Sequence, residues 1–400
     1  MPIPVAPSSA AAGRSGAGWL GAAIAVLAAT NGVIFPLLAD LQDAHGLPTY
    51  GLGLMSAATF LVGLAAQLAL APQADRGASR RLLLAGLAAA VASQLWLTAA
   101  TELWEFVAAR ALAGLAVGCF VPAARAVVAT LDPQHVGRNL GRLASAELGG
   151  FVCGPLVGAV VAEQVGLHVP FAVLAVAAAA MGLALARQSL PTPATAQPAG
   201  VGGPLAPMAR LVRRPGVQVA ALLGLALYLP VGIYDSLWAR YLEDRGASTL
   251  FVGASLTLYG VPFVLLAGLG GRLVDRWGPA RSAAVALAPV ALLTAAYGAV
   301  EVPMLIAGIS LVEAVLQAGA VPGAQAAMAR ACPPGLVAAG QGLMGALQLA
   351  GAGAAALLGA PVYEAAGSTA VFGGAAAVMA LLGLLAWRCH RVGIRAREVV

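Results

Sequence analysis

The 400-residue chain contains no lysine, and only 10% of its residues are charged. A soluble domain of this size usually carries about 25% charged residues. Hydrophobic residues make up 60% of the chain, and its mean hydropathy is +0.89. The shortage of charge therefore excludes an ordinary soluble domain and indicates that lipid surrounds most of the chain.

Chemistry-bearing motifs are also scarce. The four cysteines have no metal-ligand spacing, so we expect isolated thiols and no metal or other cofactor; they are Cys119, Cys153, Cys332 and Cys389. The spans hold no paired histidines, no serine–lysine dyad and no glycine loop followed by Lys-Ser/Thr, which argues against an enzyme and against an ATP-driven pump. A membrane enzyme or a non-transporting sensor remains a distant alternative.

Twelve apolar stretches are long enough to cross a bilayer as helices, which takes about 20 residues each. They are unalternating, which argues against β-barrel strands. The sequence therefore predicts an all-α polytopic membrane protein. The spans are 18–39, 51–72, 82–100, 103–130, 140–163, 168–187, 216–240, 250–271, 282–300, 303–329, 337–362 and 368–388.

A stretch rich in Pro, Gly and small residues separates the sixth span from the seventh and reads as a flexible linker. It divides the chain into two six-span halves. The predicted order is a tail (1–17), the first half (18–187), the linker (188–215), the second half (216–388) and a basic tail (389–400).

The arginines cluster in alternate turns. The positive-inside rule makes these turns, and both termini, cytoplasmic. The opposite turns carry only Arg240 and Arg245, among several carboxylates. Because the net charge of +6 comes from these turns, it does not indicate a nucleic-acid partner.

The two halves also repeat each other at an offset of 200 residues. Asp75-Arg76 and Asp275-Arg276 occupy equivalent basic turns between apolar runs. The same offset relates Gly46, Thr49, Gly53, Arg81, Val121 and Pro122 to Gly246, Thr249, Gly253, Arg281, Val321 and Pro322. Internal repeats of this kind are typical of secondary transporters.

The turn of the second half resembles the signature loop of the major facilitator superfamily, G-x-L-x-D-R-x-G. Its residues are Gly271, Asp275, Arg276, Gly278 and Arg281, and the weaker first copy offers Asp75, Arg76, Arg80 and Arg81. By this resemblance the glycines let helices approach, and the acid and arginines form a charge lock that breaks when the halves rock. Asp132 could complete the lock with Arg76, or be a solvated loop carboxylate. A basic turn that only sets topology is the alternative for both copies.

Two helix motifs add to the resemblance. The fourth span carries Arg110, Gly114, Gly118 and Pro122, and in the family the arginine of this motif is associated with proton coupling; a purely structural arginine is the alternative. The fifth span carries Gly150, Gly154, Pro155 and Gly158, which is similar to the motif of drug:proton antiporters. Small residues at this spacing make a smooth face for close helix packing.

Polar residues inside the spans are candidates for function because charge in hydrocarbon is costly unless paired or hydrated. Glu313 lies about 15 Å into its span, near the midplane, with Gln317 one turn further. The resemblance places these two, with Asn31, Arg110, Tyr234 and Asp235, around the central cavity.

Asp235 could share a face with Tyr228 and Trp238 and attract a lipophilic cation. The competing interpretation puts Tyr228, Trp238 and Tyr241 in an interfacial aromatic belt. Glu147 could take part in proton coupling, or pair with Arg142 or Arg125.

These features predict a multi-pass inner-membrane transporter that resembles the drug:proton antiporter subfamilies and works by alternating access. We expect proton-coupled export of small amphipathic or drug-like molecules, with Glu313, Asp235, Arg110 and Glu147 as coupling candidates. A proton-coupled importer of a small metabolite is the alternative. The expected partners are a small-molecule substrate, protons and the lipid bilayer, and we expect a monomer without a nucleic-acid partner.

Overall fold

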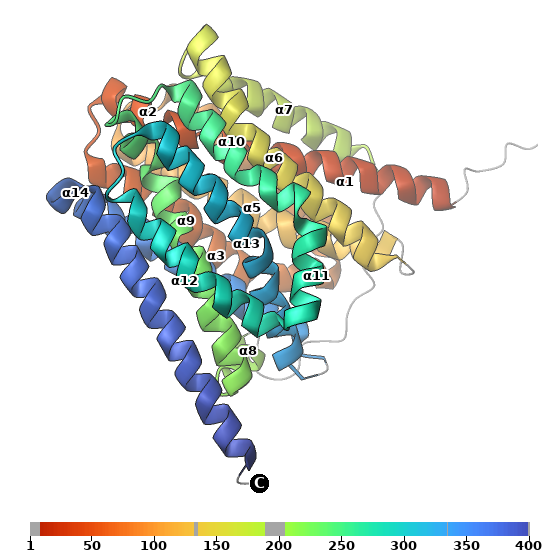
Figure 1. Cartoon of the computed structure of the whole chain (residues 1–400). Coiled ribbons are helices and arrows are strands. Elements are labelled where there is room, and N and C mark those ends of the chain that lie inside the picture. Colours follow the sequence, from red (N-terminus) through yellow and green to blue (C-terminus); the bar gives the residue numbers. More distant parts are fainter. Residues whose placement is uncertain (1–8, 132–134, 189–204, 334, 399–400) are drawn as a thin grey trace, which may run out of the picture.

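The computed structural model describes residues 9–131, 135–188, 205–333 and 335–398. Within these ranges the regular secondary structure is entirely helical. Figure 1 shows the helices packed side by side in one elongated bundle. The all-α fold predicted from the sequence is confirmed.

The first half comprises α1 to α7. Its elements are α1 (Ser9–Gly32), η1 (Phe35–Leu37), α2 (Leu38–His45), α3 (Thr49–Gln73), the π-helical turn η2 (Ala74–Ala78), α4 (Ser79–Ala99), α5 (Leu103–Leu131), α6 (Val136–Val165) and α7 (Val169–Ala186). Most of the predicted linker, residues 189–204, lies outside the described residues.

The second half follows a short helix, α8 (Leu205–Leu211). Its elements are α9 (Pro215–Glu243), α10 (Thr249–Leu265), α11 (Ala267–Trp277), α12 (Pro279–Tyr297), α13 (Pro303–Ala331) and α14 (Val337–Glu398).

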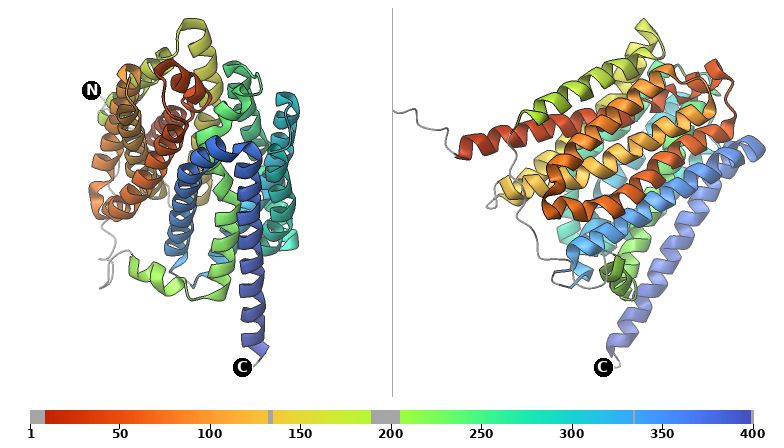
Figure 2. Two further views of the ribbon diagram at one scale, coloured as in Figure 1. Left: turned by 90° about the vertical axis from the view of Figure 1, so that its left-hand side faces the viewer. Right: turned by 180° about the vertical axis from the view of Figure 1, so that it is seen from behind.

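Ten of the described helical segments are long and apolar enough to cross a membrane, and α10 and α11, bent by 59° relative to each other, pass the same test when taken together. The last segment, α14, is broken at Gly367, whose φ of 75° lies in the left-handed region that glycine adopts without strain. Figure 2 shows its two arms folding back on each other at this break. The arms correspond to the eleventh and twelfth predicted spans.

The repeat in the sequence has a structural counterpart. Gly46 ends α2 and Gly246 follows α9, and both adopt positive φ. Gly53 of α3 packs against Ala356 and Ala360 of α14, whereas Gly253 of α10 packs against Pro155 and Ala159 of α6. Gly53 and Gly253 thus each let a helix of one half approach the other half closely.

The two halves share one hydrophobic core at the end of the bundle that carries the acidic turns. It joins residues of the first half such as Leu41 and Leu52 to residues of the second such as Leu237 and Tyr241. At the arginine-rich end each half has a core of its own. The conformation is therefore closed between the halves at the acidic end, which the arginine distribution predicts to be the outer one.

The glycines of the fifth-span motif bring α6 against α1. A Cβ on Gly150 would overlap the carbonyl oxygen of Ala25, and one on Gly154 would lie 2.9 Å from that of Ala29. Gly158 meets the carbonyl of Val33 in the same way. The missing side chains let the two backbones touch, which is how helices associate in lipid.

Replacing Gly150 by alanine is expected to destabilise the protein by about 1 to 3 kcal/mol because α1 and α6 must move apart. The neighbouring Gly149 is the matched control, since a Cβ there has nothing within 4 Å. Alanine is the better helix former by about 1 kcal/mol, so Gly149→Ala should be neutral or stabilising. The unfolding midpoints of the two purified variants are compared. Equal midpoints would show that the close contact of α1 with α6 at Gly150 does not contribute to stability.

Candidate transport site

A buried ion pair connects the two halves at the centre of the molecule. Arg110 of α5 contacts Asp235 of α9, with 3.3 Å between Nη2 and Oδ1. Their side chains are 1% and 5% exposed. The Ser56 hydroxyl of α3 donates to the same Asp235 oxygen at 3.3 Å. Three helices from both halves therefore meet at one carboxylate.

Both the side chain and the backbone of Arg110 have further contacts. Its guanidinium carbon lies 5.7 Å from the centre of the Phe35 ring, and its backbone carbonyl accepts from the Thr59 hydroxyl at 3.1 Å. Its Nε has no hydrogen-bond partner among the described residues. The glycines that follow, Gly114 and Gly118, pack α5 against the backbone of α3, so a rigid helix pair presents the charge.

A second buried carboxyl, Glu313 of α13, lies inside the second half. Its side chain is fully buried. The Tyr297 hydroxyl donates to Oε2 at 2.6 Å, the Tyr234 hydroxyl lies 3.0 Å from both oxygens, and Gln317 Nε2 donates to Oε1 at 2.8 Å. No cation pairs with Glu313 within the described part of the chain. Its charge, when present, is stabilised by neutral donors alone.

Two adjacent residues of α9, Tyr234 and Asp235, belong to the two different buried carboxyl sites. Asp235 faces Arg110 across the halves, whereas Tyr234 turns toward Glu313 in its own half. The predicted grouping of Asp235 with Trp238 is not what the structure shows. Trp238 packs against Tyr234 and Tyr297, with ring centres 5.3 Å apart in both cases, and donates its indole N–H to Ser255.

Trp238 and Tyr241 also do not form an interfacial belt, because they are 4% and 0% exposed inside the protein. Tyr228, two turns before Asp235, is half-buried.

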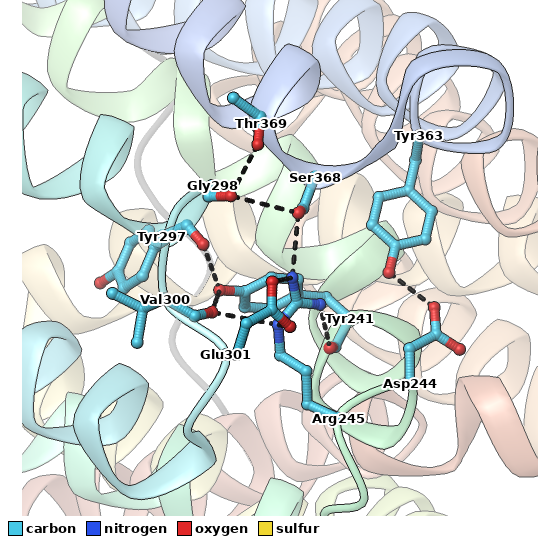
Figure 3. A network of polar contacts seen from close by, with 10 residues as sticks. All are labelled: Tyr241, Asp244, Arg245, Tyr297, Gly298, Val300, Glu301, Tyr363, Ser368 and Thr369. Carbon is cyan, nitrogen blue, oxygen red and sulfur yellow. Dashed lines mark hydrogen bonds and ion pairs between the residues drawn. The ribbon is translucent and has the colours of Figure 1, made fainter.

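A polar network at the acidic end fixes the helix that carries Tyr297 (Figure 3). The Tyr241 hydroxyl donates to the backbone carbonyl of Tyr297. Arg245 lies 4.1 Å from the Tyr241 ring centre and donates to the Val300 carbonyl and the Ser368 hydroxyl. These contacts bind the loop after α12 to α9 and α14. They also hold in position Tyr297, whose side-chain hydroxyl contacts Glu313.

Polar contacts also join the two halves at this end. Arg240 Nη1 of α9 lies 2.8 Å from Asp43 Oδ1 of α2. The Thr249 hydroxyl of α10 donates to Asp40 Oδ2 at 2.8 Å. These contacts tie α2 of the first half to α9 and α10 of the second.

His45 and His168 meet within the first half, with 3.4 Å between their Nε2 atoms. Burial and the neighbouring His45 ring lower the pKa of His168. The lower pKa favours the neutral ring, so one imidazole can donate to the other.

Two further predicted site residues have local partners. Asn31 Nδ2 donates to the Leu27 carbonyl of its own helix at 3.3 Å and is 8% exposed. Glu147 pairs with Arg125, not Arg142, at 3.3 Å, in a partly exposed position.

The signature loops adopt different backbones. In the first copy, Asp75 and Arg76 lie in η2, and Arg80 donates to the Ala186 carbonyl at 2.6 Å while Arg81 is exposed. Asp132 lies outside the described residues, as do the side chains of Asp75 and Arg76.

In the second copy, Asp275 of α11 lies 3.6 Å from Arg330 of α13, and Arg276 and Arg281 are exposed. The expectation of close helix approach at the loop glycines is wrong for Gly271 and Gly278, where a Cβ would meet nothing within 4 Å. The close approach occurs one residue earlier, since a Cβ on Gly270 would lie 2.6 Å from the Ala318 carbonyl. Gly278 instead supplies a φ of 87° between α11 and α12.

The sequence profile that describes the Major Facilitator Superfamily matches residues 19–239 and 220–397, so it recognises each half. The chain belongs to this superfamily. It is accordingly a multi-pass inner-membrane transporter and not an enzyme.

Similar proteins agree with this assignment. Multidrug resistance protein MdtG of Enterobacter lignolyticus is 37% identical over 120 residues, and that of Serratia proteamaculans 35% over 124. These stretches cover 30% and 31% of this chain, and only 28% and 30% of the length of the two relatives.

Solved structures share the fold over nearly the whole length. A bacterial homologue of the human lysosomal transporter Spinster, in an inward-facing and unoccupied conformation, has a TM-score of 0.80 at 13% identity and covers 98% of this chain and 99% of its own. The nucleoside transporter NupG has a TM-score of 0.77 at 11% identity and covers 94% of this chain and 99% of its own.

Proposed function

We propose that this transporter exports small amphipathic molecules in exchange for protons by alternating access. Glu313 is the observation that carries the proposal. Burial disfavours the charge of a carboxyl, whereas hydrogen-bond donors favour it. Glu313 combines complete burial with donors from Tyr234, Tyr297 and Gln317 and no cation among the described residues. Such a carboxyl can take up and release a proton when access to solvent changes.

The ion pair between the halves supplies the link to the conformational cycle. Arg110 and Asp235 attract each other across the interface and favour the conformation that is closed at the acidic end. A proton on Asp235 removes one of the two charges and weakens this attraction. Protons that arrive from the acidic side would thus favour opening of the outer end.

Two further features support export of drug-like cargo. The first is the similarity to two multidrug resistance proteins. The glycine motif of α6, which resembles that of drug:proton antiporters, packs α6 against α1.

The proposal is tested first in cells that lack other efflux pumps. Expression of the protein should lower the accumulation of at least one compound in a panel of fluorescent amphipathic dyes. A panel without such a compound would contradict export of drug-like molecules, and raised accumulation would favour the importer.

The coupling ion is then tested in inverted vesicles with the compound so identified. An imposed pH gradient, acidic inside, should drive its uptake, and nigericin, which removes the gradient, should stop it. Uptake that withstands nigericin would contradict proton exchange.

A further inference from the structure

A concave site separate from the ion pair lies between α11, α12 and α13. The groove has a volume of about 640 Å³. Its walls are apolar, and they are formed by Leu269 and Leu273 of α11, Val285 and Pro289 of α12, and Val315 and Gly319 of α13. Figure 1 shows these three helices together on one side of the bundle.

This groove opens away from the transport site. Val315 and Gly319 each follow Glu313 and Gln317 by two residues, which places them about 200° further around α13. Glu313 is fully buried, whereas Val315 is 46% exposed. Leu269 and Val285 are 57% and 53% exposed on the same groove. An exposed apolar surface on a membrane-spanning helix faces lipid, so acyl chains can reach the groove.

The mouth of the groove is basic. Arg272 and Arg276 line it and lie one turn apart on α11. Neither guanidinium has an ion pair or a hydrogen bond to another described residue. Asp275, the acidic residue between them, pairs with Arg330 of α13 instead. Two positive charges are therefore available at the arginine-rich end of an apolar groove.

We propose that this groove binds an anionic phospholipid from the leaflet at the arginine-rich end. A guanidinium group binds phosphate oxygens through opposite charge and paired hydrogen bonds. An acyl chain would lie on the apolar walls between α12 and α13. Trp277, at the rim and 47% exposed, would sit at the level of the head group, where tryptophan is favoured. Basic pockets between membrane helices bind anionic head groups by the same physics.

Native mass spectrometry of the detergent-purified protein, titrated with phosphatidylglycerol or phosphatidylcholine, tests the proposal. Wild-type protein should bind phosphatidylglycerol more tightly. In the double variant Arg272→Gln/Arg276→Gln this preference should fall roughly tenfold or more, because both charges that attract the anionic head group are gone. The matched control is Arg388→Gln/Arg391→Gln, which removes two charges from α14 at the same end and should retain the preference.

A second variant tests whether the apolar walls of the groove contribute to lipid binding in addition to the positive charge of the arginines. A Cβ on Gly319 would have two ordinary contacts, 3.8 Å from Leu273 Cδ2 and 4.0 Å from Gly270 Cα, so Gly319→Leu adds bulk to the groove and leaves both arginines in place. It should weaken phosphatidylglycerol binding although the net charge is unchanged. Inorganic phosphate should not displace the lipid, because it cannot occupy the apolar walls. Equal binding by wild type, Gly319→Leu and both double variants would overturn the proposal.

Discussion

Replacing Glu313 by glutamine is expected to reduce pH-gradient-driven transport to the rate of protein-free vesicles. Glutamine has nearly the same shape and can still accept from the Tyr297 hydroxyl, but it carries no exchangeable acidic proton. The partners Tyr234, Tyr297 and Gln317 remain in place. The substitution therefore removes the proton and replaces one of the two acceptor oxygens by an amide nitrogen, while the shape of the side chain is kept.

Two transport modes separate coupling from folding. Exchange of labelled for unlabelled substrate at equal concentrations needs no net proton movement, so the Glu313→Gln protein should retain it. Uptake driven by a pH gradient into inverted vesicles should disappear. A variant that loses both modes has lost substrate binding or its fold, and one that keeps both shows that Glu313 does not carry the proton.

Glu147→Gln is the matched control for this experiment. Glu147 also lies in a membrane helix and was a coupling candidate, but it is partly exposed and paired with Arg125. Its charge is already compensated, so its loss should leave gradient-driven transport near the wild-type rate. Equal loss in both variants would place coupling outside Glu313 alone.

The fold was predictable because a helix that crosses a membrane needs a long run of apolar residues, and such runs are visible in the sequence. The twelve apolar runs correspond to the helices found, and the last two predicted spans correspond to the two arms of α14, which is broken at Gly367. Boundaries were less accurate where apolar sequence continues past a bend. The first predicted span ended at 39, whereas helical structure continues through η1 and α2 to His45. The bend between α10 and α11 was also missed.

The site was only partly predictable because hydropathy says little about the direction in which a side chain points. The sequence placed Gln317 one turn beyond Glu313, and the family resemblance listed Tyr234 among the cavity residues without predicting the contact that it makes with Glu313. Their partner Tyr297 was missed because it lies at the end of α12, on a helix not expected to reach the site. Its one sequence signal is an isolated tyrosine at the close of an alanine-rich run.

Ser56 was missed for a different reason. Its hydroxyl reaches Asp235 only because the two halves are closed at the acidic end. Contacts between halves depend on the conformation as well as on the sequence, so the sequence of a single span does not predict them. The pair of Arg110 with Asp235 belongs to the same class, although both residues were candidates on their own.

Neutralising Asp235 alone is expected to lower the free energy of unfolding by about 3 to 5 kcal/mol, because Asp235→Asn leaves Arg110 charged and buried without an anion. Arg110→Met should be similarly costly, since it leaves Asp235 uncompensated. The double variant Arg110→Met/Asp235→Asn carries neither charge and should be more stable than either single variant. Reversible unfolding in mixed micelles measures all three against wild type.

The pair of Arg125 with Glu147 is a built-in comparison, since its 3.3 Å separation is the same as that of Arg110 and Asp235. The side chains of Arg125 and Glu147 are 56% and 30% exposed, against 1% and 5% for the central pair. Exposed pairs contribute about 0 to 1 kcal/mol, so Glu147→Gln should scarcely change stability. If it costs as much as Asp235→Asn, or if the central double variant is no more stable than the single ones, burial is not what makes the central pair matter. If the order holds, burial is what makes the central pair matter, and the proposed opening of the acidic end would have to separate two buried charges, a cost that a proton on Asp235 would reduce.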